Sequence, residues 1–503
     1  MLPQNIKDKV QRLWNTFRNN GMTDGLVALE QISYLLFLRW LEKADEYDNV
    51  VGKKRKSIFD GHEQCLWTNF CQLRAEKMMD NYRNEIFPFL KSVDPEYIPY
   101  VKYLDNAKDE ITKPALMFDA VQLINDIFDD VMNEVAKFKN NVDLQGEVYE
   151  YLINEMLSSN KSMAKTPRNL IHLMCDLVDP DIDDLIYDPV CGTGGYLIGA
   201  FQHIMTKHTP SNKRIKDEDG LEIYYDSKDA DLSTEQLKQI ESSVLYGNDI
   251  DKSMVRIAAL NLMFHGVIHP EISCSDFLTE RKNLDDDRRK PTVILATPPF
   301  GGRFLQAGMP ADLIEYGRNE DNLFMVRIMD FLDEGGKAAV IVPEKFLFNL
   351  SVQSIEVRKK LVTENQIKAI ISLPMGIFKP FSDLKTSIII FTKEHPDNGS
   401  VWYYELSNDG YSLDKSRRKL KQNPLPQVES LYRKKGNQKN RTQQCFTVNY
   451  DEIINNNFDL RFDRYREYEE EEIEIRDPKE LMEDILNLEN ELQRDLKSFN
   501  NMI

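Results

Sequence analysis

Three of the β-strands expected from the sequence end in an acidic side chain, and a glycine-rich turn follows the first. The acids are Asp188, Asp249 and Asp276, and the turn covers residues 191–195. Glycine lets the backbone turn tightly and lets a ligand approach closely. An acid after the second strand is placed to accept hydrogen bonds from ribose hydroxyls. Each feature alone is typical of a turn or a helix cap, but the three acids in this order indicate a nucleoside ligand.

An aromatic residue, Phe277, follows the third acid. This pair suits an adenine ring, with Asp276 accepting from the exocyclic amine and Phe277 stacking on the ring. The glycine turn is not the dinucleotide-binding fingerprint, because Leu197 stands at the third glycine position. A tight turn without a ligand is the alternative interpretation of the glycines alone.

A fourth expected strand, 293–296, runs into the tetrapeptide Thr297, Pro298, Pro299 and Phe300. Two prolines fix the backbone and remove two N–H donors. Outward carbonyl groups then lie beside an aromatic face. Such a loop suits a planar base that bears an amino group, and a rigid loop without a ligand is the alternative.

The elements that must position these motifs alternate between strand and helix from about residue 165 to 395. This alternation predicts an α/β fold with a mostly parallel sheet covered on both faces. Ligands of such sheets bind at the carboxyl ends of the strands, where all four motifs fall. Residues 1 to about 145 show apolar residues at helical spacing, as in Leu26, Leu29 and Ile32. We interpret them as a helical packing or docking domain.

The composition is that of an acidic globular protein of several domains. The 503 residues include 83 acidic and 64 basic side chains, for a net charge of −19. This charge disfavours a stand-alone nucleic-acid binder, because phosphate is bound mainly by Lys and Arg. No apolar run approaches the ~20 residues of a membrane span. Six scattered cysteines without metal-ligand spacing make zinc an unlikely cofactor and favour a reduced, cytoplasmic setting.

Two C-terminal segments depart from this average. Residues 415–441 carry ten Lys or Arg and one acid, Glu429, and form either a solvated loop or a segment that contacts phosphate. An acidic run, 467–474, precedes a helix with apolar residues at heptad-like spacing. That helix packs either on its own chain or on a partner, and its apolar residues are Leu481, Ile485, Leu488, Leu492 and Phe499.

Taken in order, the motifs resemble an amino-group DNA methyltransferase. More narrowly, they resemble the modification (methyltransferase) subunit of type I restriction-modification systems, which forms N6-methyladenine. The segments 146–152, 373–378 and 409–414 resemble that subunit too, so the resemblance covers nearly the whole chain. The motifs that carry it are Thr166-Pro167-Arg168, Asp188 to Gly195, Gly247-Asn248-Asp249, Asp276-Phe277 and Pro298-Pro299-Phe300.

This resemblance implies a Rossmann-like, S-adenosylmethionine-dependent methyltransferase sheet with an N-terminal α-helical domain and a C-terminal helical tail. The expected division is a helical domain at 1–145, a methyltransferase core at 146–425, and a basic linker with a partner-docking tail at 426–503. The resemblance implies that the cofactor is held by Lys165, Thr166, Pro167, Arg168, Asp188, Gly192, Thr193, Gly194, Gly195, Asp249, Asp276 and Phe277.

The catalytic residues implied by the resemblance are Thr297, Pro298, Pro299 and Phe300. A target adenine in double-stranded DNA would be flipped into this loop. Phe300 would stack on the base and the Pro298 carbonyl would accept from its N6 amine. No metal is expected. The partners implied are a specificity subunit that reads the target sequence, with two copies of this chain on each, and a restriction subunit.

Thr297 departs from the family pattern, which has Asn or Asp before Pro-Pro-Phe. A side-chain acceptor there would help to localise the N6 lone pair for attack on the methyl group. The threonine hydroxyl is about a bond shorter than an asparagine carbonyl. Loss of a well-placed acceptor costs ~1–3 kcal/mol, or roughly one to two orders of magnitude in rate. Thr297 is therefore either an inactivating substitution or the mark of a slow or differently posed enzyme.

Two other functions stay open at this point. Pro-Pro-aromatic loops serve any planar amide or amine, so a methyltransferase acting on RNA or protein is one alternative. A catalytically silent subunit that binds cofactor and DNA within a defence complex is the other, and Thr297 favours it.

The net charge of −19 is unevenly distributed along the chain: residues 415–441 sum to +9, from ten bases and one acid. We expect weak, salt-sensitive DNA binding by the isolated chain.

Overall fold

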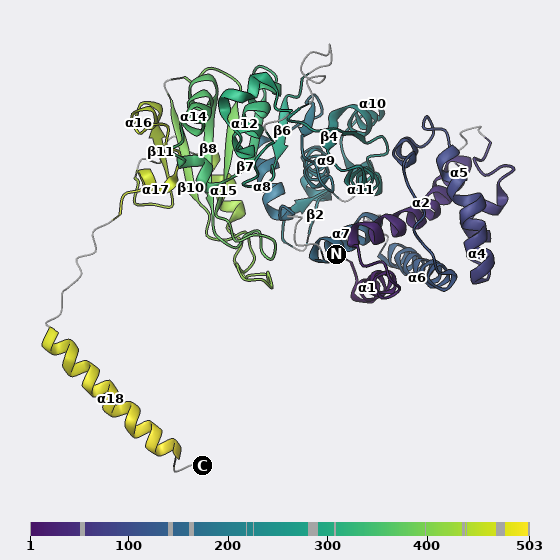
Figure 1. Cartoon of the computed structure of the whole chain (residues 1–503), viewed down its shortest axis with the longest axis horizontal. Coiled ribbons are helices and arrows are strands. Elements are labelled where there is room, and N and C mark those ends of the chain that lie inside the picture. The colour runs from purple at the N-terminus through teal and green to yellow at the C-terminus, as the bar shows by residue number, and fades with distance from the viewer. Residues whose placement is uncertain are drawn as a thin grey trace. The chain divides into compact units, whose positions relative to one another are not determined.

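The computed structural model divides the chain into two compact units, one ending at Tyr465 and one beginning at Arg466 (Figure 1). Each unit is described by itself. Side chains at 47–50, 133–138 and 497–500 are not described. The residues that the structure describes are 2–50, 56–138, 144–159, 165–217, 219–224, 226–279, 290–305, 308–397, 399–434, 438, 440–468 and 478–500.

The N-terminal part is helical, as the spacing of apolar residues predicts. In α1, Ile6, Val10, Leu13 and Phe17 are fully buried. Their spacing of three to four residues places them on one helix face, and this face packs on α6 and α7. The helices of this part are α1 (Gln4–Asn19), α2 (Gly25–Val50), α3 (Trp67–Phe70), α4 (Ala75–Asn81), α5 (Phe87–Ser92), α6 (Pro114–Phe138) and α7 (Leu144–Ser159).

A nine-stranded sheet in the order β11-β10-β8-β9-β7-β6-β1-β4-β5 forms the centre of the larger unit. Seven strands run parallel, whereas β9 and β11 are antiparallel to their neighbours. A separate pair joins β2 to β3. The strands are β1 (Ile186–Asp188), β2 (Ile215–Lys216), β3 (Glu222–Ile223), β4 (Leu245–Asp249), β5 (Glu271–Cys274), β6 (Val293–Ala296), β7 (Lys337–Pro343), β8 (Gln366–Leu373), β9 (Thr386–Thr392), β10 (Ser400–Glu405) and β11 (Cys445–Asn449).

Helices cover both faces of this sheet. Alternate residues of β6 contribute to two different cores: Val293 and Leu295 to one, Ile294 and Ala296 to the other. This burial on both faces explains why the central strands read as continuous apolar runs. The α/β fold class is thereby confirmed. The covering helices are α8 (Arg168–Val178), α9 (Gly195–Lys207), α10 (Thr234–Gln239), α11 (Lys252–Phe264), α12 (Glu320–Phe331), α13 (Glu344–Phe348), α14 (Val352–Glu364), α15 (Leu425–Arg433), α16 (Tyr450–Asn455) and α17 (Phe462–Tyr465).

The helical part is fixed to one end of the sheet. Figure 1 shows it beside α11. The Tyr103 hydroxyl donates to the Pro270 carbonyl at 2.7 Å and accepts from the Ile272 N–H of β5 at 2.9 Å. Arg256 of α11 forms a buried ion pair with Glu30 of α2. The two parts therefore share polar contacts as well as a continuous apolar core.

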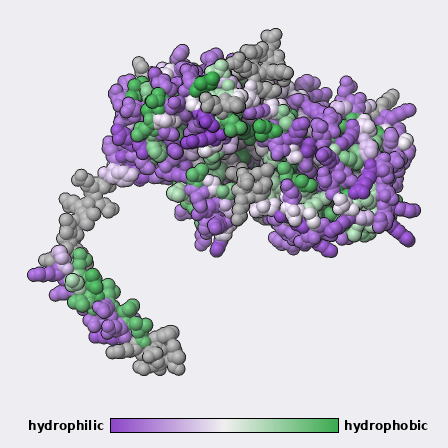
Figure 2. All heavy atoms as spheres, viewed as in Figure 1, coloured by the Kyte–Doolittle hydropathy of each residue, from purple (hydrophilic) through white to green (hydrophobic). Residues whose placement is uncertain are grey.

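The second unit contains one long helix, α18 (Pro478–Asn500), with a hydrophobic stripe in Figure 2. Leu481, Ile485, Leu488 and Leu492 are 44–65% exposed. The Phe499 side chain, the acidic residues 469–474, and Lys435 and Lys439 of the basic segment lie outside the described residues. The three-part division at 145 and 425 stays a prediction. Across the described helices, none is both long and apolar enough to cross a membrane.

Candidate functional site

The glycine turn and the three acids converge at the carboxyl edge of adjacent parallel strands. The strands β6, β1, β4 and β5 lie next to one another in that order, so the residues that follow them meet at one edge. The Gly192 N–H donates to Asp249 Oδ2 at 3.0 Å. Gly192 and Gly194 adopt φ of +53° and +82°, a region that favours glycine. The turn leads directly into the first residue of α9, Gly195.

Asn248, which precedes the ribose-type acid, ties three of these loops together. Its side-chain carbonyl accepts from the Ser273 and Ser275 hydroxyls at 2.8 and 2.7 Å. Its amide donates to the Pro189 and Ser275 carbonyls at 3.2 and 3.0 Å. The sequence motif contains Asn248, but its role as the connection between the loops could not be read from spacing alone.

Two of the three acids, the buried Asp188 and the half-buried Asp249, lie at this edge without a cation among the described residues. Asp188 is 2% exposed, and burial raises its pKa well above the usual range. Burial also raises the pKa of Asp249. Within the described residues neither acid forms an ion pair. The edge therefore holds acidic side chains that a cationic ligand would neutralise.

The third acid and its aromatic neighbour have different surroundings. Asp276 accepts from the Leu278 N–H at 3.0 Å. The Phe277 ring is 6% exposed and packs against Tyr187, Phe324 and Phe331. The Phe277 ring is therefore part of the core, and only the Phe277 backbone lies at the carboxyl edge of the sheet.

The tetrapeptide after β6 carries a closed hydroxyl network. Thr166 donates to Thr297 Oγ1 at 2.9 Å, and the Tyr196 hydroxyl lies 2.7 Å from the same atom. Tyr196 also bonds to the Met174 sulfur at 3.2 Å. A hydroxyl offers one donor and two acceptor positions, so Thr297 keeps capacity for at most one further acceptor bond. Nothing local in the sequence pointed to Tyr196.

The aromatic end of this loop faces a second aromatic residue. Phe300 is half-buried and meets Phe378 edge to face, with ring centroids 5.7 Å apart and planes at 83°. Pro298 is buried and Pro299 is exposed. Phe378 comes from the segment 373–378, which the sequence singled out without a role.

The start of α12 holds the loop in place. The Gly301 N–H donates to Asp321 Oδ1 at 3.1 Å, and Asp321 is 8% exposed. Burial raises the pKa of Asp321. Arg303 and Asn319 form an isolated β-bridge beside it. Asp321 was missed from the sequence, although Asn319 before Glu320-Asp321 is a typical helix N-cap signal.

An apolar residue at this edge also escaped notice. Ile250 directly follows Asp249 and is 70% exposed. An exposed aliphatic side chain next to a ribose-type acid offers a flat apolar contact for a ring. The signal available in the sequence was its position at a strand end, where polar residues are the norm.

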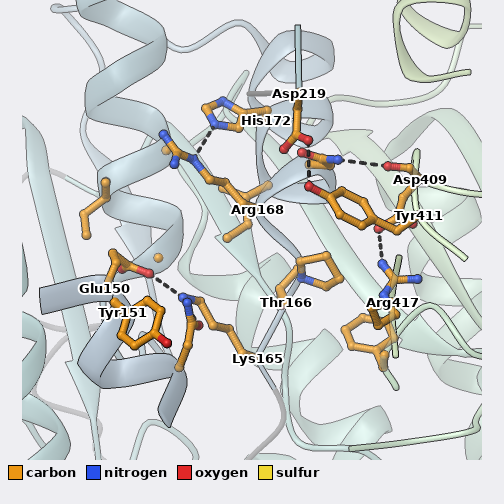
Figure 3. Close-up of a pocket in the computed structure, with 18 of the residues that line it drawn as sticks. Glu150, Tyr151, Lys165, Thr166, Arg168, His172, Asp219, Asp409, Tyr411 and Arg417 are labelled. Carbon is orange, nitrogen blue, oxygen red and sulfur yellow. Dashed lines mark hydrogen bonds and ion pairs between the residues drawn. The ribbon is translucent and has the colours of Figure 1, made fainter. Parts of the chain in front are cut away.

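Four segments that the sequence singled out line one cavity of about 410 Å³. It is bordered by Glu147, Glu150 and Tyr151 of α7, by 165–168, by Ile377 and Phe378, and by Asp409 and Tyr411. Figure 3 shows Glu150 and Lys165 on one side of Thr166, and Asp409, Tyr411 and Arg417 on the other.

The charges on the α7 wall are paired. Glu150 bonds to Lys165, and Asn261 donates to Glu150 at 2.8 Å and to the Thr193 carbonyl at 2.9 Å. Burial alone would raise the pKa of Glu150, but the Lys165 charge and these hydrogen bonds lower it to about 2. Arg168 contacts Glu147 at 3.4 Å. Lys165 and Arg168 are thus held by acids of the helical domain.

The opposite wall leaves acceptor atoms unused. Asp409 pairs with Arg417 through one carboxylate oxygen, while Oδ1 of Asp409 and Oδ1 of Asn169 are buried and unpartnered within the described residues. The Asn169 amide donates to the Asp409 carbonyl at 2.9 Å. These two acceptors are buried behind the cavity wall and are not open to a ligand in the cavity.

Family models match almost the entire chain. The N-6 DNA Methylase model matches residues 140–474, and the HsdM N-terminal domain model matches residues 6–156. Their overlap falls in α7. Residues 165–300, with all the motifs described above, fall inside the first match.

The most similar relatives bear type I restriction names. The chain is 26% identical over 499 residues to the type I restriction enzyme EcoEI methylase subunit of Escherichia coli, covering 95% of this chain and 93% of that protein. It is 21% identical to the type I restriction enzyme MjaIX methylase subunit of Methanocaldococcus jannaschii, covering 98% and 89%.

Solved structures share the fold. A chain from a study of complex assembly and conformational transition of the type I R-M system matches with a TM-score of 0.66 at 22% identity, covering 99% of this chain and 98% of that one. The type I methyltransferase subunit from Streptococcus thermophilus matches with a TM-score of 0.65 at 16% identity, covering 93% and 100%.

Proposed function

The chain belongs to the N-6 DNA methylase family of type I restriction-modification methylase subunits, and from this premise we propose that it transfers a methyl group from S-adenosylmethionine to N6 of an adenine in double-stranded DNA. The observation that supports this most directly is the meeting of the three acids with the Thr297–Phe300 loop at one sheet edge. An adenosyl cofactor and a target base need both features close together.

The charge of the edge fits the proposed cofactor. S-adenosylmethionine carries a sulfonium and an ammonium group, and the buried Asp188 and half-buried Asp249 have no cation beside them among the described residues. A cation that binds beside them repays part of their burial cost. The backbone at Gly192 and Gly194 leaves no side chain in the way of the ligand.

We assign contacts with the cofactor residue by residue. Asp249 would accept from the ribose hydroxyls with the lone pairs that the Gly192 and Asp251 N–H groups leave free, and Ile250 would cover one face of the adenine. Asp276 would accept from the adenine amine, and Phe277 would contribute its backbone, because its ring lies in the core. The methionine end would be met by Thr193, Gly194, Gly195 and by Lys165, Thr166, Pro167 and Arg168.

When bound, S-adenosylmethionine supplies an electrophilic methyl group. The Pro298 carbonyl would accept one hydrogen of the flipped adenine's amine, and Phe300 would stack on its ring. Orientation and polarisation are the contributions we assign to the loop, because N6 needs its lone pair freed rather than a strong base. Asp321 would keep the loop in register through Gly301.

Thr297 limits the second hydrogen-bond acceptor that the loop can offer to the adenine amine, beside the Pro298 carbonyl. Its hydroxyl already receives a hydrogen bond from Thr166 and shares another with Tyr196. The single Tyr196 proton is donated to the Met174 sulfur, so Thr297 donates to Tyr196 while it accepts from Thr166. These two bonds fix the direction of the hydroxyl and leave one acceptor position for the base. This network favours a second candidate function: a subunit that binds cofactor and DNA but transfers methyl groups slowly or not at all.

Partners follow from the family rather than from the chain alone. We propose that a separate specificity subunit reads the target sequence, that two copies of this chain join it, and that a restriction subunit adds cleavage. The exposed apolar stripe of α18 suits docking on a partner helix. The basic segment at 415–441 suits contact with phosphate, and Arg418 and Lys421 are exposed there.

Transfer of tritiated methyl groups by the assembled complex tests the proposal. With plasmid DNA, label should appear as N6-methyladenine, and RNA or protein in the same assay should stay unlabelled. Lys238→Gln, an exposed position on α10 away from the site, is the matched control. Label in RNA or protein would reassign the substrate. Tight cofactor binding without any transfer would favour the silent subunit.

A further inference from the structure

Apolar side chains are unusually exposed on the connections that leave the carboxyl edge of the sheet. The strands β4, β6, β7 and β8 are parallel, so the connections after them emerge at the same edge as Thr297. By contrast, Ile268 before β5 lies at the opposite edge and is 37% exposed. The side chains on the carboxyl-edge connections that are 60–81% exposed are Ile250, Leu305, Ile314, Leu350, Val352 and Met375.

A polar hollow of about 490 Å³ lies among these connections. Gly301 and Gly302 of the catalytic loop form one wall, and Asn349 and Ser351 form another. Leu350 and Val352 therefore flank its rim, at 81% and 72% exposure.

The hollow is positively charged. Arg303, Arg318 and Lys345 line it, and none of them forms an ion pair within the described part of the chain. Two acids lie at it: Asp321, which is 8% exposed and engaged by the Gly301 N–H, and Glu320, whose carboxylate packs against Gly302. Three cations against these two acids leave the hollow net positive. A net positive site with backbone glycines beside it suits a phosphate group.

We propose that this hollow binds a backbone phosphate of the DNA strand next to the flipped adenine, with Leu350 and Val352 contacting the distorted duplex. The inference rests on the proposed function. Because the hollow shares Gly301 and Gly302 with the loop that receives the target base, its occupant must be continuous with the target nucleotide. Exposed aliphatic side chains that press against unstacked base steps are a recurrent way to stabilise distorted DNA.

Binding of the full-length chain to a fluorescein-labelled duplex of roughly 30 base pairs with an adenine–adenine mismatch tests the charged part. The dissociation constant is measured by anisotropy from about 50 to about 200 mM salt, with S-adenosylmethionine present. Replacing two of the three cations, Arg303→Gln with Lys345→Gln, should lower the slope of log K against log salt by about 1 to 2. The paired control, Lys238→Gln on α10, should leave the slope unchanged.

The aliphatic part is tested with 2-aminopurine at the mismatched position. Leu350→Ala with Val352→Ala should leave the salt slope unchanged, weaken binding several-fold and reduce the emission of the extrahelical base. Met132→Ala on α6, which is 60% exposed, is the matched control and should change neither.

Several outcomes would overturn this assignment. If the variant that lacks Arg303 and Lys345 had the same salt slope as the unmodified chain, the hollow would not bind a phosphate. This conclusion would hold even if methyl transfer were normal. Loss of a specificity subunit from the complex at an unchanged slope would assign the hollow to a protein partner. If the variant lost S-adenosylmethionine binding as much as duplex binding, the hollow would be part of the cofactor site. Absence of both duplex binding and methyl transfer by the unmodified chain in the assembled complex would refute the proposed function itself.

Discussion

The pKa values of two sets of buried or half-buried carboxylates in this molecule are shifted in opposite directions. Glu150, where the helical part meets the sheet, bonds to Lys165 and Asn261, and its pKa is lowered to about 2. At the carboxyl edge, Asp188 and Asp249 have no ion-pair partner among the described residues, and burial raises their pKa. The chain completes the first network with its own residues and leaves the second open.

This difference separates structure from binding. Breaking a completed network leaves a buried charge or amide unpaired, which destabilises the protein. A buried acid without a cation already costs stability in the free protein, and such groups cluster at functional sites. The two regions therefore respond in opposite ways to loss of a carboxylate. Thr297 is the exception at the carboxyl edge. Its hydroxyl is already hydrogen-bonded to Thr166 and Tyr196, as the groups around Glu150 are bonded to one another.

The largest effect is expected at the completed network. Glu150→Ala should lower the free energy of unfolding by about 2 to 3 kcal/mol, because it removes the carboxylate that pairs with Lys165 and accepts from Asn261. Lys165 would keep only the Asn154 acceptor, and the Asn261 amide only the Thr193 carbonyl. Urea denaturation measures this. Glu46→Ala is the control, since Glu46 and its partner Lys43 are both more than half exposed, and it should cost less than about 0.5 kcal/mol. Equal losses would erase the distinction between the two kinds of carboxylate.

Thr297→Asn should replace the single acceptor position that the hydroxyl network leaves with a side-chain carbonyl. We expect N6-methyladenine formation by the assembled complex to rise about tenfold to hundredfold, because a carbonyl acceptor is gained at the amine. Single-turnover methyl transfer measures the chemical step. Thr297→Val, which keeps the shape and removes the hydroxyl, should be no faster than Thr297. An asparagine variant no faster than the unmodified chain would show that position 297 does not limit transfer.

Asp188→Asn should reverse the pattern of Glu150. The free energy of unfolding should stay level or rise, because an unpaired buried charge is removed, while the affinity for S-adenosylmethionine should fall about tenfold. Calorimetry gives the affinity. Asp179→Asn is the counterpart at an acid paired with His203 and Lys207: it should lose stability and keep the affinity. Cofactor affinity unchanged in Asp188→Asn would remove that acid from the site.

Cofactor binding should release protons. In the free protein the pKa values of Asp188 and Asp249 lie above the usual range of the carboxyl group, and a cation beside them lowers these values on binding. The affinity should therefore fall as the pH is lowered through the raised pKa values of the free protein, by at most about tenfold per pH unit for each acid. Titrations in buffers of different ionisation enthalpy count the protons. A pH-independent affinity would mean that the acids stay neutral in both states.

The sequence predicted the sheet because its strands are buried apolar runs of recognisable length. The expected strand 293–296 coincides with β6, and the expected 337–343 coincides with β7. Since parallel strands share a carboxyl edge, placing acids after the strands was enough to bring them together. The fold class and the membership of the methyltransferase family are confirmed, whereas the roles of the individual site residues stay predictions.

Contacts between distant segments could not be predicted in this way. Thr166 and Thr297 are 131 residues apart and bond directly, and local periodicity holds no information about that pairing. The two-residue strands β2 and β3 are too short to show a period. The cavity formed by 146–152, 165–168, 373–378 and 409–414 arises only when the chain folds. The role of Asp321 could not be predicted for the same reason, because it depends on Gly301 lying opposite and donating its N–H.

The Tyr103 hydroxyl at the end of the sheet has a consequence for self-association. An outer strand offers unpaired N–H and carbonyl groups to any other strand, which is the usual start of aggregation. Tyr103 bonds to the Ile272 N–H of β5 and to the carbonyl of Pro270, which precedes β5, and Lys102 adds a charge at Glu271. The helical part thus shields the sheet from other chains. A fragment without the helical part would expose the unpaired backbone groups of β5 to other chains. We expect such a fragment to aggregate, and the contact with Tyr103 prevents this in the full chain.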